Sequence, residues 1–493
     1  MNFQAPLFAF DNSYARELEG FYVAWEGDAV PEPRILRLNR GLAEELGLDA
    51  EALDTQAGAE VLTGKARPEG GNPLAMAYAG HQFGGFSPQL GDGRALLIGE
   101  VLDREGQRRD IHLKGSGRTP FSRGGDGKAV LGPVLREYLI GEAMHALGVP
   151  TTRALAALTT GERIVREGPK QGAVLARVAA SHLRVGTFQF FAARGETDRL
   201  RKLADYAIAR HYPDLADEPN RYLGLLERVR NVQAALVAQW VSVGFVHGVM
   251  NTDNMTISGE TIDYGPCAFI DSYDAQAVFS SIDRQGRYAY GNQPTIAQWN
   301  LARFAEALLD LIEARDSQDA VGQATDVINA FPEIYQREWL ARMRAKLGLS
   351  SERSSDIVLV NDLHAAMDGQ DVDFTNLFRE LRQAVLGEMA PVRTRFRDPQ
   401  VIDGWLDRYR QRLAEETAGP VEIADAMDRT NPVYIPRNHK VQAALDAAEA
   451  GDMTAFDRLL DAVTQPFALR EGLTDCAQPA PAGFGPYTTF CGT

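Results

Sequence analysis

The sequence is poor in the features that mark secreted and membrane proteins. It has only 3 cysteines in 493 residues, too few for a disulfide framework, and its cysteines and histidines lack zinc-type spacing. No apolar run approaches the roughly 18 residues that a membrane helix needs. The segment Met1–Pro6 has neither the basic start nor the apolar core of a secretory signal. We therefore expect a cytoplasmic protein that does not associate with membranes.

Positive charge is also scarce, since the formal net charge is -16. A negative protein repels phosphate backbones, so we expect no general nucleic-acid binding, although a local basic pocket is compatible with this average. Hydrophobic residues make up 45% and charged residues 24%, which is typical of a soluble globular protein. Because 493 residues exceed what one hydrophobic core usually supports, we expect two lobes.

The segment Val246–Met255, followed by Ile262–Gly265, carries the most specific motif of the chain. A protein kinase has His-Arg-Asp, four further residues and Asn in its catalytic loop, and Asp-Phe-Gly in its metal-binding loop. Asn254 and Asp263 match the kinase Asn and the second Asp, but Val249 stands where the catalytic Asp of a kinase would be. The two segments therefore resemble the nucleotide site of a kinase that lacks its usual base.

The oxygen-bearing side chains of these loops predict a metal site and a base. Asn254 and Asp263 offer hard oxygen ligands which, together with phosphate oxygens and water, suit Mg²⁺ or Mn²⁺. Asp253 is the only acid within the first loop, so it is the candidate to accept a proton from an incoming hydroxyl. We expect His247 to hold the loop backbone rather than to act as a base.

The order of predicted elements agrees with a kinase. We expect buried strands at residues 94–102, 110–114 and 173–179 and a helix at 129–147. After about residue 186 the pattern becomes mostly helical, with a long helix at 221–243. We predict an α+β, protein-kinase-like bilobal fold, with a β-containing N-terminal lobe (1–185) and a mainly helical C-terminal lobe with extensions (186–493).

A glycine turn and a strand lysine precede the helix at 129–147. In Gln89–Arg94, Gly91 and Gly93 would let backbone amides approach a phosphate, or they would simply form a hairpin turn. Lys114 ends an apolar strand and therefore needs a partner or an anionic ligand, unless it extends to water at an edge. Glu137 and Glu142 are the candidate partners, and we favour Glu137.

Further basic and glycine residues follow this lysine. The segment 115–128 is rich in glycine, arginine and lysine, and predicts either a flexible loop that folds over phosphates or a solvated surface loop. Asp126 and Gly127 within it are candidate nucleotide contacts. Arg177 interrupts an apolar strand and Arg184 follows closely; both suit phosphate recognition, with structural salt bridges as the alternative.

Two cysteines suggest a redox hypothesis. Cys267 lies two residues after the Asp263–Gly265 loop, and Cys491 is third from the end of a tail rich in proline, glycine and alanine. A tail that reached back would form a reversible disulfide with Cys267 and restrain the metal loop. A buried, inert thiol is the alternative for Cys267.

Taken together, these motifs resemble the selenoprotein O family, the kinase-fold protein adenylyltransferases. The resemblance covers nearly the whole chain and rests on Gln89–Arg94, on His112–Arg123, on the loop through His247 and Asn254, and on Cys491, which stands where some members carry selenocysteine. It implies transfer of AMP from ATP to Ser, Thr or Tyr hydroxyls of proteins, with ATP bound in reverse relative to kinases. The expected partners are ATP and protein substrates, and we expect a monomer.

The resemblance also implies roles for the candidate residues. Asp253 is the implied proton acceptor, Asn254 and Asp263 are the implied metal ligands, and Cys267 and Cys491 form the implied redox pair. The implied nucleotide contacts are Gly91, Gly93, Arg94, Lys114, Asp126, Gly127, Arg177, Arg184 and Asp263. Two other functions remain open from the residues: a kinase-type phosphotransferase that uses Asp253, and an inactive pseudokinase that acts as a nucleotide-binding scaffold.

Overall fold

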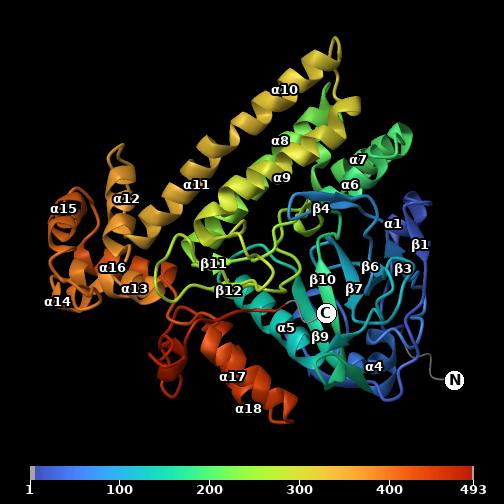
Figure 1. Ribbon diagram of the computed structural model, residues 1–493, viewed down its shortest axis with the longest axis horizontal. Coiled ribbons are helices and arrows are strands. Elements are labelled where there is room, and N and C mark those ends of the chain that lie inside the picture. Colours follow the sequence, from blue (N-terminus) through green and yellow to red (C-terminus); the bar gives the residue numbers. More distant parts are fainter. Residues whose placement is uncertain (1–5, 491–493) are drawn as a thin grey trace.

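A computed structural model describes residues 6–490 of the chain (Figure 1). Cys491, which the predicted disulfide needs, lies outside the described residues. So do residues 1–5, which belong to the segment that we compared with a secretory signal. Among the helices of residues 6–490, none is both long enough and apolar enough to cross a membrane.

One antiparallel sheet dominates the first part of the chain. In spatial order its strands are β1 (Tyr22–Ala24), β3 (Leu74–Met76), β6 (Ala95–Leu102), β7 (Arg108–Lys114), β10 (Pro169–Ala179), β9 (Arg153–Val165) and β2 (Arg34–Leu38), with β8 (Ala129–Val130) beside β10. Two small hairpins stand apart from it: β4 (Gly80–Gln82) with β5 (Gly85–Ser87), and β11 (Phe245–Val246) with β12 (Ala268–Phe269).

The two faces of the main sheet pack against different helices, because successive side chains of a strand point to opposite faces. Ile111 and Leu113 of β7 belong to a core shared with α2 (Arg40–Glu45), α3 (Ala50–Leu53) and α4 (Gln56–Leu62). Leu97 of β6 and Leu175 of β10 face the core formed with α5 (Leu131–Ala146). At the end of α5, Gly148 adopts a left-handed conformation (φ 77°), which stops the helix.

The rest of the chain is mainly helical. Its helices are α6 (Val185–Ala192), α7 (Thr197–His211), α8 (Arg221–Ser242), α9 (Gln293–Leu308), α10 (Ser317–Asn329), α11 (Phe331–Lys346), α12 (Asp356–Met367), α13 (Phe374–Val385), α14 (Ala390–Arg393), α15 (Asp403–Leu413), α16 (Pro420–Thr430), α17 (Asn438–Glu449) and α18 (Thr454–Val463); the short α1 (Ser13–Glu17) begins the chain. Figure 1 shows the sheet at one end of the long axis and α12–α16 at the other.

The last two helices return to the sheet. Both α17 and α18 pack against α5, the helix that covers one face of the sheet. The predicted division at residue 185 therefore separates a β-containing part from a helical part by sequence, but contacts connect the C-terminal helices to the N-terminal part.

The predicted elements correspond to β6, β7, β10, α5 and α8, with small differences at their ends. The long strand β9 is absent from the sequence prediction, because its buried residues at 154–158 are mostly alanines and leucines, which favour helices. Pairing with β10 and β2 overrides this preference. The fold is thus mixed α/β with one main antiparallel sheet, and its likeness to a kinase stays an interpretation.

Candidate active site

The strand lysine of the sequence motif has a defined partner. Lys114, the last residue of β7, places its Nζ 2.7 Å from Oε2 of Glu137 on α5. Glu142, the other candidate, instead binds Arg153, with 2.8 Å between Oε2 and the guanidinium. The two glutamates are five residues apart and therefore point to different sides of α5. Glu137 is the one that faces the end of β7.

Asp263 lies at the centre of a buried cluster of charges. Its Oδ1 is 2.9 Å from Lys114 Nζ and 2.7 Å from the guanidinium of Arg177, and its Oδ2 is 2.7 Å from that of Arg184. Burial opposes ionisation of Asp263, but the three cations outweigh it and hold its pKa well below the usual range. Asp263 is therefore ionised at neutral pH.

The ion pairs of this cluster involve more cations than carboxylates. Arg177 also binds Oε1 of Glu137 at 3.1 Å, so three cations share two carboxylates. Arg177 and Arg184 are 2% and 3% exposed, and the guanidinium of Arg184 lies 4.7 Å from the ring centre of Tyr78. An excess of buried positive charge is costly unless an anion neutralises it. The cluster therefore suits an anionic ligand.

Local backbone geometry fixes the two loops. The His247 ring donates from Nε2 to the carbonyl of Ile262, 2.9 Å away, and so ties the first loop to the second. Asn254 donates from its Nδ2 to the carbonyl of Val249 at 3.0 Å. Asp263 has a φ of 60°, a conformation that residues other than glycine rarely adopt. Val249 thus positions Asn254 through its backbone carbonyl, although its apolar side chain cannot act as a base or as a metal ligand.

Asn254 and Asp263 have a donor set that fits a divalent cation. Because the amide nitrogen of Asn254 is committed to Val249, its oxygen is left to accept a ligand. Amide and carboxylate oxygens are the ligands that Mg²⁺ and Mn²⁺ prefer. Within residues 6–490, no group of three or more His, Cys, Asp or Glu side chains could hold a metal by itself. An ion between Asn254 and Asp263 would therefore take further ligands from phosphate or water.

Asp253 sits beside the cluster on a 3-10 turn, Thr252–Asn254. Its side chain is buried: a Cβ placed on Gly80 would lie only 2.5 Å from Oδ1, so only glycine fits there. Burial raises the pKa of Asp253 to about 6, although the charge of Arg184 opposes the rise. Arg184 also donates to the Asp253 carbonyl at 2.7 Å. A carboxyl group with such a pKa can accept a proton near neutral pH.

The glycine turn and the segment 115–128 pack on each other. Gly91 has a φ of 83° and lies directly against the ring of Phe121, and Thr119 donates to the carbonyl of Asp92 at 2.6 Å. Phe121 is buried with side chains of the sheet. The segment is therefore partly packed on the sheet and not fully solvated. Its packing fixes the position of Gly91 and Gly93.

Besides Gly91 and Gly93, three more predicted nucleotide contacts lie outside the charge cluster. Asp126 binds the guanidinium of Arg166 at 2.8 Å and is half-exposed, and Gly127, with a φ of 68°, accepts from the N–H of Gly117 at 3.2 Å. Arg94 is partly buried just before β6. Their contact with a nucleotide stays a prediction.

The C-terminal tail lies against the segment that follows the second loop. Thr489 donates from its hydroxyl to the carbonyl of Pro266 at 2.8 Å, and Tyr487 accepts from Arg136 at 3.0 Å. Arg136 also binds the carbonyl of Cys267, whose thiol is buried and has a raised pKa because of that burial. The described part of the tail therefore ends close to the backbone around Cys267.

A comparison of the chain with known families agrees with the geometry of this site. The family model described as protein adenylyltransferase SelO matches residues 7–464. The chain belongs to this family. Membership in the SelO family makes it a nucleotidyltransferase.

Bacterial relatives are similar along their full length. A protein from Cereibacter sphaeroides (strain KD131) named protein nucleotidyltransferase YdiU is 62% identical over 488 residues, which covers 99% of this chain and 100% of the relative. Proteins of the same name from Sphingopyxis alaskensis and from Mycobacterium sp. (strain KMS) are each 56% identical over 486 residues, covering 99% and 98% of this chain and 100% and 99% of the relatives. This SelO chain therefore has the length of its relatives.

Several polar residues that support the site were not among the predicted site residues. His112 accepts at Nδ1 from Arg177 at 3.2 Å, and its Nε2 lies 3.2 Å from Oδ2 of the buried Asp92. Tyr78 stacks under Arg184. The alternation of β7 already placed His112 on the same face as Lys114, and that was the available signal. No sequence signal indicated Tyr78, because it lies in a short apolar stretch.

Proposed function

We propose that this protein transfers AMP from ATP to Ser, Thr or Tyr hydroxyls of proteins and releases pyrophosphate. The observation that carries the proposal is the buried excess of positive charge at Lys114, Arg177 and Arg184, next to an acid with a pKa of about 6. A kinase fold in which ATP is reversed would direct its terminal phosphates to these cations and leave the α-phosphate at the acceptor. Membership in the SelO family supports the same reaction.

The residues of the chain would divide the reaction between them. Asp253 takes the proton of the acceptor hydroxyl as its oxygen bonds to the α-phosphorus, and the bond from that phosphorus to pyrophosphate breaks. Lys114, Arg177 and Arg184 neutralise the charge that develops on pyrophosphate. Because these cations are held by Glu137 and Asp263 before ATP arrives, little reorganisation is needed during the reaction.

Asn254 and Asp263 would hold Mg²⁺ or Mn²⁺, which would neutralise phosphate charge and orient the nucleotide. Asp263→Ala should therefore abolish metal-stimulated turnover. Equal turnover of the Asp263→Ala variant and the wild type would rule out this metal role.

Two labelled nucleotides separate this function from its alternatives. The protein is incubated with a protein acceptor and ATP labelled on either the α- or the γ-phosphate. AMP transfer puts only the α label on the acceptor. Transfer of the γ label alone would instead establish a kinase-type reaction, and no transfer of either label would favour a nucleotide-binding scaffold.

We also propose that a reversible disulfide between Cys267 and Cys491 regulates the enzyme. The position of Thr489 against Pro266 supports this pairing, because it brings the end of the described tail beside Cys267. The measurement is the rate of α-label transfer with and without reductant in wild type and in Cys491→Ser. A response to reductant that is identical in both proteins would contradict the proposal.

A further inference from the structure

The β4–β5 hairpin lies against the loop that carries Asp253. The His81 N–H donates to the hydroxyl of Thr252 at 2.7 Å, and the Phe83 N–H donates to Oδ1 of Asn251 at 3.1 Å. Gln82 places its Nε2 3.4 Å from Oδ2 of Asp253. The hairpin is thus the element that separates Asp253 from one side of the protein surface.

This hairpin carries two large apolar side chains that are partly exposed. Phe83 and Phe86 are 39% and 43% exposed, although large apolar side chains are usually buried. Among the described residues, β5 pairs only with β4, so its other edge has backbone groups that no strand uses. Such an edge can accept an extended segment of another chain.

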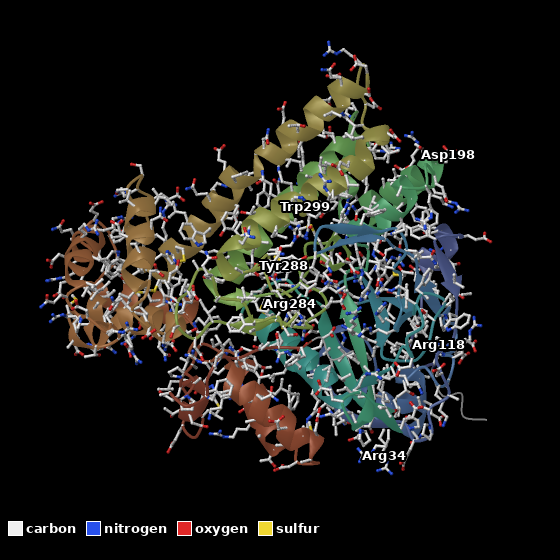
Figure 2. The ribbon with its side chains drawn as sticks, in the orientation of Figure 1. Arg34, Arg118, Asp198, Arg284, Tyr288 and Trp299 are labelled. Carbon is white, nitrogen blue, oxygen red and sulfur yellow. The ribbon has the colours of Figure 1, made fainter. Side chains whose placement is uncertain are left out.

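Aromatic and cationic side chains continue this surface. His81 lies between Phe86 and Trp299, with ring centres 4.9 and 5.4 Å away. The guanidinium of Arg287 lies 4.8 Å from the ring centre of Trp299. Figure 2 labels Tyr288 and Trp299 in the central part of the molecule, well separated from Arg34 at the edge of the sheet. We call Phe83, Phe86, Arg287 and Trp299 the hairpin surface.

Arg287 leaves its charge available to a partner. Among the described residues, no carboxylate lies within 4.0 Å of its guanidinium, and its Nε has no hydrogen-bond partner. Its guanidinium packs against the hairpin tip, 3.8 Å from where a Cβ on Gly84 would be. An arginine beside aromatic rings and without a carboxylate partner can bind a carboxylate of another chain in two-point geometry.

We propose that the hairpin surface docks the acceptor protein, through an extended segment that combines an apolar side chain with an acidic one. The apolar side chain packs on Phe86 and Trp299, the carboxylate binds Arg287, and the segment's backbone pairs with β5. The neighbouring hydroxyl is then directed to Asp253 past Gln82. The inference rests on the proposed function and deepens it, since it states the chemistry by which the protein substrate is recognised.

The first test compares kinetic constants for the acceptor with those for ATP. Arg287→Gln and Phe86→Ala should each raise KM for a protein acceptor about fivefold to tenfold and leave KM for ATP unchanged, because the hairpin surface does not contact the charge cluster. The matched controls are Arg34→Gln and Val421→Ala, whose side chains are exposed far from the hairpin. Equal values in variants and controls would overturn the proposal.

The second test does not depend on AMP transfer. The probes are two short fluorescent peptides that contain serine and leucine and differ only in having glutamates or lysines beside them. Wild type and Arg34→Gln should bind the acidic peptide at least about fivefold more tightly, and Arg287→Gln should lose this preference. Equal binding of both peptides by wild type would overturn the docking surface even if AMP transfer is established.

The two tests also separate this inference from the function and from self-association. If neither labelled phosphate is transferred, the proposed function is wrong. The peptide preference then still tests whether the hairpin surface binds an acidic segment. If sedimentation shows a dimer that Phe86→Ala dissociates, a second copy of the chain is the occupant, and the acceptor proposal is wrong.

Discussion

Two buried ion clusters of this protein have opposite charge balance. At the active site, Lys114, Arg177 and Arg184 share Glu137 and Asp263, which leaves an excess of positive charge. In the other cluster, Arg437 is fully buried and binds two carboxylates, Asp271 at 2.6 Å and Asp373 at 2.8 Å. The first is short of an anion, and the second has more negative than positive charge.

The second cluster has a structural role that its contacts explain. Asp373 caps the N-terminus of α13 by accepting from the N–H of Asn376 at 2.7 Å, and Arg437 also donates to the carbonyl of Ala477 at 3.1 Å. The cluster therefore joins four segments that are distant in sequence, through both terminal nitrogens of Arg437. Buried ions alone do not indicate a binding site; an unneutralised charge beside a reactive group does.

The largest expected effect comes from the centre of the active-site cluster. Asp263→Asn keeps the shape but removes the charge that three cations share, so AMP transfer should fall about 1,000-fold. Initial rates of α-label transfer measure the loss, with circular dichroism to establish that the variant is folded. A rate within tenfold of wild type would mean that Asp263 is not the hub of catalysis.

The structural cluster should respond in stability instead. Arg437→Met leaves Asp271 and Asp373 buried without their cation, so the free energy of unfolding should fall by about 3 kcal/mol. Urea unfolding measures it, with Arg34→Met as the exposed control. Activity per folded molecule should stay within about twofold of wild type; a selective loss of activity would remove the distinction between the clusters.

Arg184→Lys tests whether geometry matters as well as charge. Lysine keeps the positive charge but loses stacking on Tyr78, and its shorter side chain weakens the two bonds that Arg184 Nη1 makes to Asp263 and to the Asp253 carbonyl. KM for ATP should rise about tenfold, with little change in stability. Titration of ATP in the α-label assay checks this, and an unchanged KM would show that charge alone suffices.

A further buried cation, Lys346, sharpens the comparison because it has no carboxylate partner among the described residues. Burial lowers its pKa to about 7, although the rings of Phe378 and Phe374, 4.2 and 5.5 Å away, favour the ammonium form. Replacing it by methionine removes the cost of burial, so Lys346→Met should stabilise the fold by about 4 kcal/mol at pH 7.

The sign of the pH dependence follows from the lowered pKa. Between about pH 7 and the ordinary value of 10.5, the unfolded chain binds a proton that the folded chain does not. Wild-type stability should therefore rise across this range relative to Lys346→Met, and the gap should nearly close at pH 10. Urea unfolding at pH 7 and 10 measures the gap; a constant difference would contradict the assignment.

The sequence predicted those parts of the site that lie in short, continuous motifs. Asn254 and Asp263 follow from loop motifs, and Lys114 from its strand. The choice between Glu137 and Glu142 needed three-dimensional information, because the two residues point about 140° apart on α5 and only packing decides which side faces β7. The hairpin surface gave no periodic signal, since its residues come from a glycine-rich turn, a loop and α9.

The packing of α17 and α18 on α5 has a consequence for how the enzyme is made. Lys170 on β10 binds Glu449 of α17 at 2.5 Å, and the tail reaches Arg136 through Tyr487, next to Glu137 on α5. The helix that supplies Glu137 is therefore braced by segments that lie far later in the chain. We expect a chain that lacks α17, α18 and the tail to hold Lys114 and Glu137 without this support, so that the site is complete only after these distant segments have packed.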